Sequence, residues 1–170
     1  MIFKISLNNE GKNRGTTLVE ALVALLILSF GLIPSFGIIL VANNFASSIR
    51  NNIIAANLAQ EGLEVVRGLR DANRYLNRSF DFGLGDGAYL IEWNSNALAP
   101  EGLNSPLKIS NQGLYNYSSG TDSIYRRRIL ITKIDPGGCN CELRITSQIT
   151  WPEKGVTKTI NVESHLFSWK

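Results

Sequence analysis

The chain has 170 residues, of which 44% are hydrophobic, and 17 Lys and Arg against 14 Asp and Glu give a formal net charge of +3. A single histidine and two cysteines argue against a histidine-based metal cluster and a disulfide-dense scaffold, and so small a net charge argues against a dedicated nucleic-acid binder. The mean hydropathy of +0.01 averages two unlike parts, because 19 of the 25 residues from 18 to 42 are apolar.

The first 15 residues are short, polar and basic, with Lys4, Lys12 and Arg14 against Glu10. Positive charge beside a membrane segment favours the cytoplasmic side. Residues 21–42 then carry no charge, and as a helix they span about 33 Å, enough for the hydrocarbon core. A cleaved secretory signal has a shorter apolar stretch of about 7–15 residues. The sequence therefore predicts a retained transmembrane helix with the C-terminal part outside.

Glu20 lies at the start of this apolar run. A carboxylate in a membrane helix costs about 2.5–3.5 kcal/mol at the centre and less near the end. Two interpretations stay open. Either Glu20 is solvated at the membrane–water interface, or it pairs with a cationic partner inside the bilayer.

The stretch Gly15-Thr16-Thr17-Leu18-Val19-Glu20, with a basic leader before it and a long apolar run after it, resembles the class III signal of type IV prepilins and pseudopilins. The resemblance implies that a prepilin peptidase cuts between Gly15 and Thr16, and that the new amino terminus is N-methylated. It also implies that Glu20 neutralises the amino terminus of a neighbouring subunit in a filament. The family usually has Phe as its first mature residue, where this chain has Thr16.

Gly31, Pro34 and Gly37 interrupt the apolar run. Proline removes a backbone donor and glycine weakens a helix, although membrane helices tolerate both where neighbours satisfy the freed groups. The residues themselves predict a kink. The resemblance adds a possible function for the three residues, which is to let the helix melt locally when the subunit enters a filament.

An amphipathic helix is predicted to follow, because no proline occurs between Pro34 and Pro100 and apolar residues recur at helical spacing. The helix should run from about residue 17 to residue 75. Its charges predict surface pairs of Glu64 with Arg67 and of Arg67 with Asp71. The apolar stripe expected to cover a sheet consists of Phe45, Ile49, Ile53, Ala56, Leu63, Val66 and Leu69–Ala72.

A glycine-rich loop is predicted at residues 77–87, where Asp81 and Asp86 raise the question of calcium. Hard-cation sites need six or more oxygens, and the loop has no EF-hand-like spacing. We therefore predict no metal site. Residues 88–93 are typical of a strand, and residues 94–123 of long connections with one or two short strands.

Three stronger strand patterns occupy residues 124–134, 141–151 and 157–169, with turn sequences between them. They predict an antiparallel meander with one apolar face, which the helix covers. The fold class is therefore α+β, and a long helix packed on such a sheet is similar to the pilin fold. The predicted parts are a leader (1–15), a transmembrane helix (16–43), an amphipathic helix (44–76) and an extracytoplasmic β domain (77–170).

Three further features are assigned ordinary roles. Arg126, Arg127 and Arg128 should alternate between the two faces of their strand, on a solvated edge, so no nucleic-acid partner is expected. Cys139 and Cys141 are too close for a wide disulfide loop, and a local disulfide and free thiols both stay open. His165 is predicted to be an ordinary strand residue.

Together these patterns predict a structural subunit and not an enzyme, with no cofactor. The resemblance implies as partners the prepilin peptidase, other pilin subunits bound through the N-terminal helix, an inner-membrane assembly platform, and membrane lipid before assembly. A minor pilin is favoured by the close cysteines and by the stretch Ala59-Gln60-Glu61-Gly62, which is similar to that of minor pilins and pseudopilins. The alternatives are a pseudopilin of a type II secretion or competence system, and a signal-anchored extracytoplasmic binding module that does not assemble.

Overall fold

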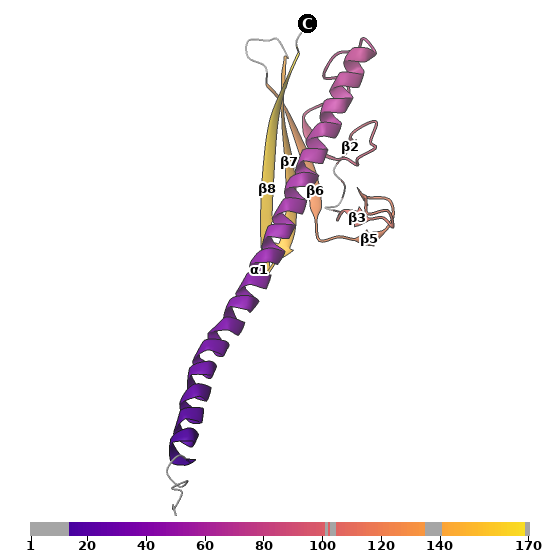
Figure 1. The fold of residues 1–170 in the computed structure, drawn as a ribbon. Coiled ribbons are helices and arrows are strands. Elements are labelled where there is room, and N and C mark those ends of the chain that lie inside the picture. The colour runs from indigo at the N-terminus through magenta and orange to yellow at the C-terminus, as the bar shows by residue number, and fades with distance from the viewer. Residues whose placement is uncertain (1–13, 101, 103–104, 135–140, 169–170) are drawn as a thin grey trace, which may run out of the picture. The chain divides into compact units, whose positions relative to one another are not determined.

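The computed structural model describes residues 14–100, 102, 105–134 and 141–168. It contains one long helix and eight strands, shown in Figure 1. The elements are α1 (Arg14–Tyr75), β1 (Gly87–Leu90), β2 (Ala99–Pro100), β3 (Lys108–Ile109), β4 (Tyr115–Asn116), β5 (Thr121–Asp122), β6 (Arg126–Ile134), β7 (Glu142–Glu153) and β8 (Val156–Phe167). The chain divides into an N-terminal unit, Met1–Ser47, and a C-terminal unit, Ser48–Lys170, and each is described by itself.

The described part of the N-terminal unit is a single helical segment that continues through Pro34. Two serines donate their hydroxyls back to carbonyls of the preceding turn: Ser29 to Leu25 and Leu26 at 2.9 Å each, and Ser35 to Gly31 at 2.7 Å. These bonds satisfy polar hydroxyls inside an apolar helix. The predicted unbroken helix is confirmed, since α1 ends at Tyr75.

A five-stranded antiparallel sheet dominates the C-terminal unit, in the order β2-β1-β6-β7-β8. β7 and β8 form a hairpin with a two-residue turn, Lys154-Gly155, because Glu153 pairs with Val156. Both turn residues have positive φ, 52° and 80°, which matches the right-handed twist of the strands. The predicted meander is confirmed.

A second, three-stranded sheet has the order β4-β3-β5. Each of its strands has only two residues, so the sequence carries too short a pattern to predict all three. Leu107, just before β3, is fully buried and packs in one cluster with Tyr125 and Trp151. The small sheet is thereby attached to the main core.

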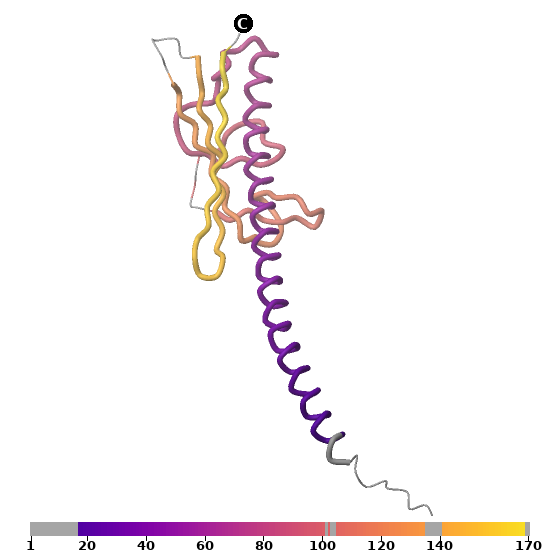
Figure 2. The backbone as a smooth tube through the Cα atoms, turned by 60° about the vertical axis from the view of Figure 1, so that its left-hand side comes forward, coloured from indigo at the N-terminus to yellow at the C-terminus, as the bar shows by residue number. Residues whose placement is uncertain are grey.

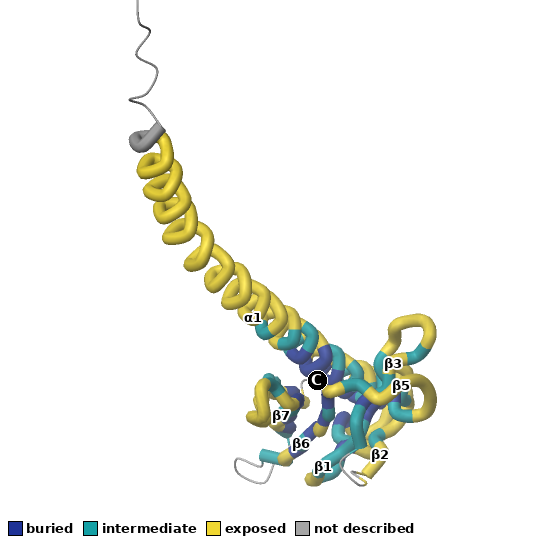
Figure 3. The backbone as a smooth tube through the Cα atoms, turned by 90° about the horizontal axis from the view of Figure 1, so that it is seen from below, coloured by how far each residue is buried: buried dark blue, intermediate teal, exposed yellow. Residues whose placement is uncertain are grey.

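The main core lies between the large sheet and the residues of α1 that belong to the C-terminal unit. β7 alternates as predicted, with Leu143, Ile145, Ile149 and Trp151 all buried. Figure 3 shows the same burial along the tube, in dark blue. The helix contributes Ala55, Leu58, Ala59, Leu63 and Val66 to this core.

The predicted apolar stripe of the helix is partly wrong. Leu63 and Val66 are buried, but Ile49 and Ile53 each remain 56% exposed. The face that meets the sheet carries Gly62, whose missing side chain allows close approach: a Cβ there would lie 2.8 Å from Ile129 Cδ1 and 3.0 Å from Ser147 Oγ. The buried face of the helix therefore combines large apolar residues with small ones, and the spacing of the large residues alone does not identify it.

Replacing Gly62 by alanine is expected to destabilise the C-terminal unit relative to replacing Gly68. Alanine is the better helix former at both positions, by about 1 kcal/mol, and a Cβ at Gly68 meets nothing within 4 Å. At Gly62 the overpacking should cost about 1–3 kcal/mol. Urea unfolding of the two variants in detergent should separate them by that amount, and equal stabilities would refute the close-packing argument.

Candidate functional site

The residues of the predicted processing and assembly motif lie at the start of α1. Gly15 and Thr16 are in its first turn, and nothing is described of the Thr16 side chain. Glu20 follows and is exposed. None of the ion pairs between described residues involves Glu20.

The surface around Glu20 is apolar. Leu18, Val19, Leu22 and Val23 are each at least half exposed, and the exposed apolar surface continues to Val41 (Figure 3). By length and composition this stretch of α1 is able to cross a membrane. Removing it from water is favourable by about 25 cal/mol per Å², so the stretch suits lipid or a neighbouring apolar helix.

Glu20 is also the only charged residue between Thr16 and Ile49. A cation that neutralises it within the apolar layer must therefore come from the amino-terminal end or from another molecule. The three helix-weakening residues, Gly31, Pro34 and Gly37, lie in unbroken helix here, and their possible melting stays a prediction.

Arg127 is the buried cation of the C-terminal unit, with a side chain that is 0% exposed. Its Nη1 donates to the carbonyl of Leu58 at 3.0 Å and lies 2.9 Å from Glu61 Oε1, and its Nη2 donates to the carbonyl of Ile91 at 2.5 Å. One guanidinium therefore joins the helix, β6 and the segment after β1. The sequence analysis did not predict this role. The available signal was the position of Arg127 two residues before the buried Ile129, because residues two apart in a strand lie on the same face.

The predicted alternation of the three arginines is confirmed by the burial of Arg127, but the predicted solvated edge is wrong. β6 lies inside the sheet, between β1 and β7. Arg126 and Arg128 point to the face opposite Arg127, as the alternation of a strand requires. The arginines therefore do not form one basic patch.

Of the two charge pairs predicted along the helix, one is present and the other is not. Arg67 Nη1 lies 2.5 Å from Glu64 Oε1, as expected, but Asp71 pairs with Arg70, at 2.6 Å from its Nε. The second nitrogen of Arg67 instead donates to Ser164 Oγ of β8 at 2.9 Å. The expected pair of Arg67 with Asp71 fails because the sheet offers Arg67 a hydroxyl that the sequence pattern does not reveal.

Asp81 and Asp86, considered above for calcium, are both engaged by Lys133 of β6. Lys133 Nζ lies 2.7 Å from Asp81 Oδ2, and its backbone N–H donates to Asp86 Oδ1 at 2.5 Å. The hydrogen bond to Asp81 raises the pKa of Lys133 above its usual value. The described residues contain no group of three or more potential metal ligands, and Lys133 contacts both aspartates, Asp81 through its ammonium and Asp86 through its backbone N–H.

The two cysteines fall at the border of the described residues. Cys141 is disulfide-bonded, and this decides between the two states that the sequence left open. The only other cysteine of the chain, Cys139, lies outside the described residues.

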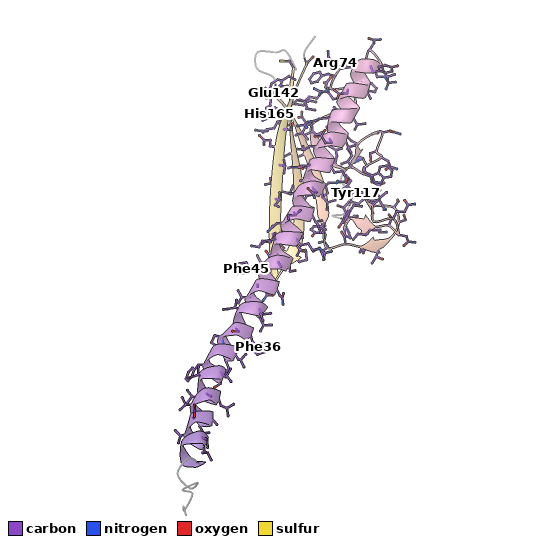
Figure 4. The ribbon with its side chains drawn as sticks, viewed as in Figure 1. Phe36, Phe45, Arg74, Tyr117, Glu142 and His165 are labelled. Atoms are coloured by element: carbon purple, nitrogen blue, oxygen red, sulfur yellow. The ribbon has the colours of Figure 1, made fainter. Side chains whose placement is uncertain are left out.

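His165 is flanked by two carboxylates at one end of the β7–β8 hairpin (Figure 4). Its Nδ1 lies 2.5 Å from Glu142 Oε1, and its Nε2 lies 3.0 Å from Glu163 Oε1. Hydrogen bonds first to Glu142 and then to Glu163 raise the pKa of His165 above 6.5, and the bond from His165 lowers the pKa of Glu163. The cluster lies on the sheet face away from the helix.

The His165 cluster is expected to make folding pH-dependent. Because the folded pKa of His165 lies above its unfolded value, its stabilising contribution is complete below about pH 6.5 and is lost as the pH rises through the folded pKa. NMR titration should place the His165 pKa above 6.5, and Glu142→Gln and Glu163→Gln should each lower it. An unchanged His165 pKa in both variants would contradict the assigned cause.

Comparison of the chain with protein-family models, curated proteins and solved structures finds no match. The described residues therefore define the fold class of the protein and a candidate membrane span, but no family. The molecule is an α+β protein with one long helix near its N-terminus, apolar enough there to span a membrane once, and with an antiparallel sheet packed on the later part of that helix.

Proposed function

We propose that this chain is a prepilin-like structural subunit that is cleaved after Gly15 by a prepilin peptidase and assembled through its N-terminal helix into a type IV pilus, as a minor pilin. One observation supports the proposal most directly. A single carboxylate, Glu20, lies five residues after Gly15, in an exposed apolar stretch of α1 that has no other charged residue between Thr16 and Ile49.

The chemistry of assembly follows from that carboxylate. Cleavage after Gly15 releases a cationic amine at Thr16. In a filament, Glu20 of one subunit neutralises this amine on a neighbouring subunit. A buried ion pair adds little net stability, but leaving one partner unpaired costs about 3–5 kcal/mol. Glu20 therefore fixes the axial register between subunits, because subunits at the wrong axial offset leave a charge unpaired.

The proposal fixes an orientation and a set of partners. Residues 1–15 lie in the cytoplasm, the apolar helix lies in lipid before assembly, and the C-terminal unit is extracytoplasmic and reaches the cell surface in the filament. The partners are the prepilin peptidase, other pilin subunits and an inner-membrane assembly platform. A pseudopilin of a secretion or competence system uses the same residues, and it differs by remaining in the envelope.

Mass spectrometry of the purified protein tests the proposal. A mature chain that begins at Thr16 supports processing by a prepilin peptidase, and an added methyl group on its amine supports N-methylation. An intact leader contradicts the proposal and favours a signal-anchored binding module. Sheared surface filaments that contain the protein support a pilus, whereas retention in the envelope with a secretion defect supports a pseudopilin.

A further inference from the structure

The β7–β8 hairpin turns back at the end of the sheet where the helix of the C-terminal unit begins. Ser147 of β7 lies beside Gly62 of the helix, because a Cβ at Gly62 would be 3.0 Å from Ser147 Oγ. Farther along β7, Glu153 Oε1 accepts a hydrogen bond from Ser48 Oγ at 2.7 Å. β7 therefore runs toward Ser48, and the turn Lys154-Gly155 extends past it. Figure 2 shows this turn as the closed, yellow end of the hairpin.

Two further contacts hold this end of the sheet to the beginning of the helix. The Glu153 carboxylate also accepts a hydrogen bond from Trp151 Nε1 at 3.2 Å, and the Tyr125 hydroxyl lies 3.3 Å from Asn51 Oδ1. The hydrogen bond from Ser48, and after it the one from Trp151, lowers the pKa of Glu153 below its usual value. The carboxylate is therefore ionised at neutral pH and keeps both bonds, so the turn stays beside Ser48.

This end of the C-terminal unit is cationic. Arg50 is the only charged residue of the helix from residue 43 to residue 60, and Lys154 and Lys158 lie in the turn and near the start of β8. All three are exposed, and none of the ion pairs between described residues involves them. The one carboxylate of the turn region, Glu153, already accepts two hydrogen bonds. The three cations are therefore available to an anionic partner.

Ordinary roles account for only part of this charge. A lysine on an edge strand discourages pairing with another strand, which explains Lys158 but neither Lys154 in the turn nor Arg50 on the helix. The small sheet supplies no excess of carboxylates, because its Asp122 lies opposite Lys108 in the register of β3 with β5.

The backbone at Lys154 strengthens this point. Its φ is 52°, a conformation that costs most L-residues energy. Two-residue hairpin turns of this kind favour Asn, Asp or Gly at the first position. A lysine there is unfavourable for the turn, so turn formation does not explain its side chain.

The covalent chain keeps these cations close to any membrane that the apolar part of α1 crosses. Ser48 follows Ala42, the last residue of the uncharged apolar run, by six residues, which is about 9 Å of helix and at most about 20 Å of extended chain. The headgroup layer is roughly 5–8 Å thick on each side of the hydrocarbon core. Its charges act over about 8–10 Å more at moderate salt. Cations beside Ser48 are therefore within reach of the lipid headgroups.

We propose that the surface formed by Arg50, Lys154 and Lys158 binds the membrane that α1 crosses, with its three cations on the phosphates of anionic lipid headgroups. The proposal rests on the membrane span of the proposed function, and not on leader cleavage or filament assembly. Three cations attract a lipid surface only weakly. Here the chain is already anchored in the same membrane, so the contact is intramolecular and a weak attraction suffices to populate it.

The test is paramagnetic relaxation measured by NMR on the full chain in nanodiscs. One set of nanodiscs contains phosphatidylcholine alone, and the other contains phosphatidylcholine and phosphatidylglycerol in a ratio of two to one. Both carry a trace of lipid with gadolinium on its headgroup. The relaxation enhancement of the N–H groups of Lys154, Gly155 and Val156 should be at least threefold larger with phosphatidylglycerol, and high salt should remove the difference. The N–H group of Arg74, at the other end of the helix, should not differ between the two lipids.

Three variants separate lipid binding from folding. Lys154→Asn removes a cation and supplies a residue that the turn favours, so its effect is not a folding defect. It should lower the enhancement with phosphatidylglycerol at least twofold, and the double variant with Lys158→Gln should reduce it to the phosphatidylcholine value. Arg74→Gln removes an exposed cation from the opposite end of the helix, and it should leave the enhancement unchanged.

Equal enhancement in the two lipids, an unchanged enhancement in the double variant, or an equal loss in Arg74→Gln would overturn the proposal. A chain that does not enter nanodiscs would overturn the membrane span, and with it both this proposal and the proposed function. A chain with an intact leader that shows the lipid-dependent enhancement would support the membrane contact and contradict the processing, so the two failures are distinguishable.

Discussion

Arg127→Ala is expected to lower the free energy of unfolding of the C-terminal unit by about 2–5 kcal/mol, the range for truncating a large buried side chain. The substitution removes the donors to the carbonyls of Leu58 and Ile91 and the partner of Glu61. It also leaves a cavity where a fully buried side chain stood. Since Glu61 is 35% exposed, water can solvate its carboxylate, and the carbonyls and the cavity account for most of the loss.

Denaturant unfolding of the full chain in detergent measures this loss. Arg128→Ala is the matched control, because its side chain is exposed on the other face of the same strand, and it should change stability by less than about 1 kcal/mol. Arg127→Met, which restores most of the volume, should fall between the two. Equal stabilities of the Arg127→Ala and Arg128→Ala proteins would show that the buried guanidinium does not hold the helix to the sheet.

Glu20→Ala is expected to reduce the amount of this protein in filaments at least tenfold while leaving leader cleavage largely intact. Under the proposed function, the amine at Thr16 remains cationic after cleavage and loses its proposed partner, Glu20 of a neighbouring subunit. An unpaired charge in that setting costs about 3–5 kcal/mol, and every 1.4 kcal/mol corresponds to a tenfold change.

Immunodetection of the variant in sheared filaments and in the membrane fraction measures the effect. Mass spectrometry of the membrane fraction supplies the control, since a mature terminus at Thr16 shows that processing has not failed. Ser29→Ala is the matched substitution in the same helix, and it should assemble normally because it removes only a local hydroxyl bond. Normal incorporation of Glu20→Ala would refute the register role.

The elements with long periodic patterns were predictable from the sequence. The end of α1 near residue 75 and the three long strands follow from apolar repeats that extend over nine or more residues. The inward positions of β7 were correct for the same reason. By contrast, β3, β4 and β5 have two residues each, and strands of that length are determined by tertiary contacts, not by local pattern.

The failures in the C-terminal unit concern partners that are distant in sequence. Arg67 was assigned to Asp71 because both lie on one helix, yet it contacts Ser164, 97 residues away. Arg127 reaches Leu58 across 69 residues. Local spacing carries no information about such contacts. The motif of Gly15, Thr16 and Glu20, by contrast, is local in sequence, because it lies within six consecutive residues. Its role in processing and assembly stays a prediction.

The contacts that hold the helix to the sheet also impose an order on folding during synthesis. Residues 48–75 leave the ribosome long before β6, β7 and β8, and the bond from Ser48 to Glu153 spans 105 residues. Contacts of such high sequence separation form slowly, so the apolar face of the helix is uncovered for most of translation. The edge strand β8 is made last and contributes Leu166 to the core. The C-terminal unit therefore completes its fold only after nearly the whole chain has been synthesised, and chains cut short before β8 should lack a complete core.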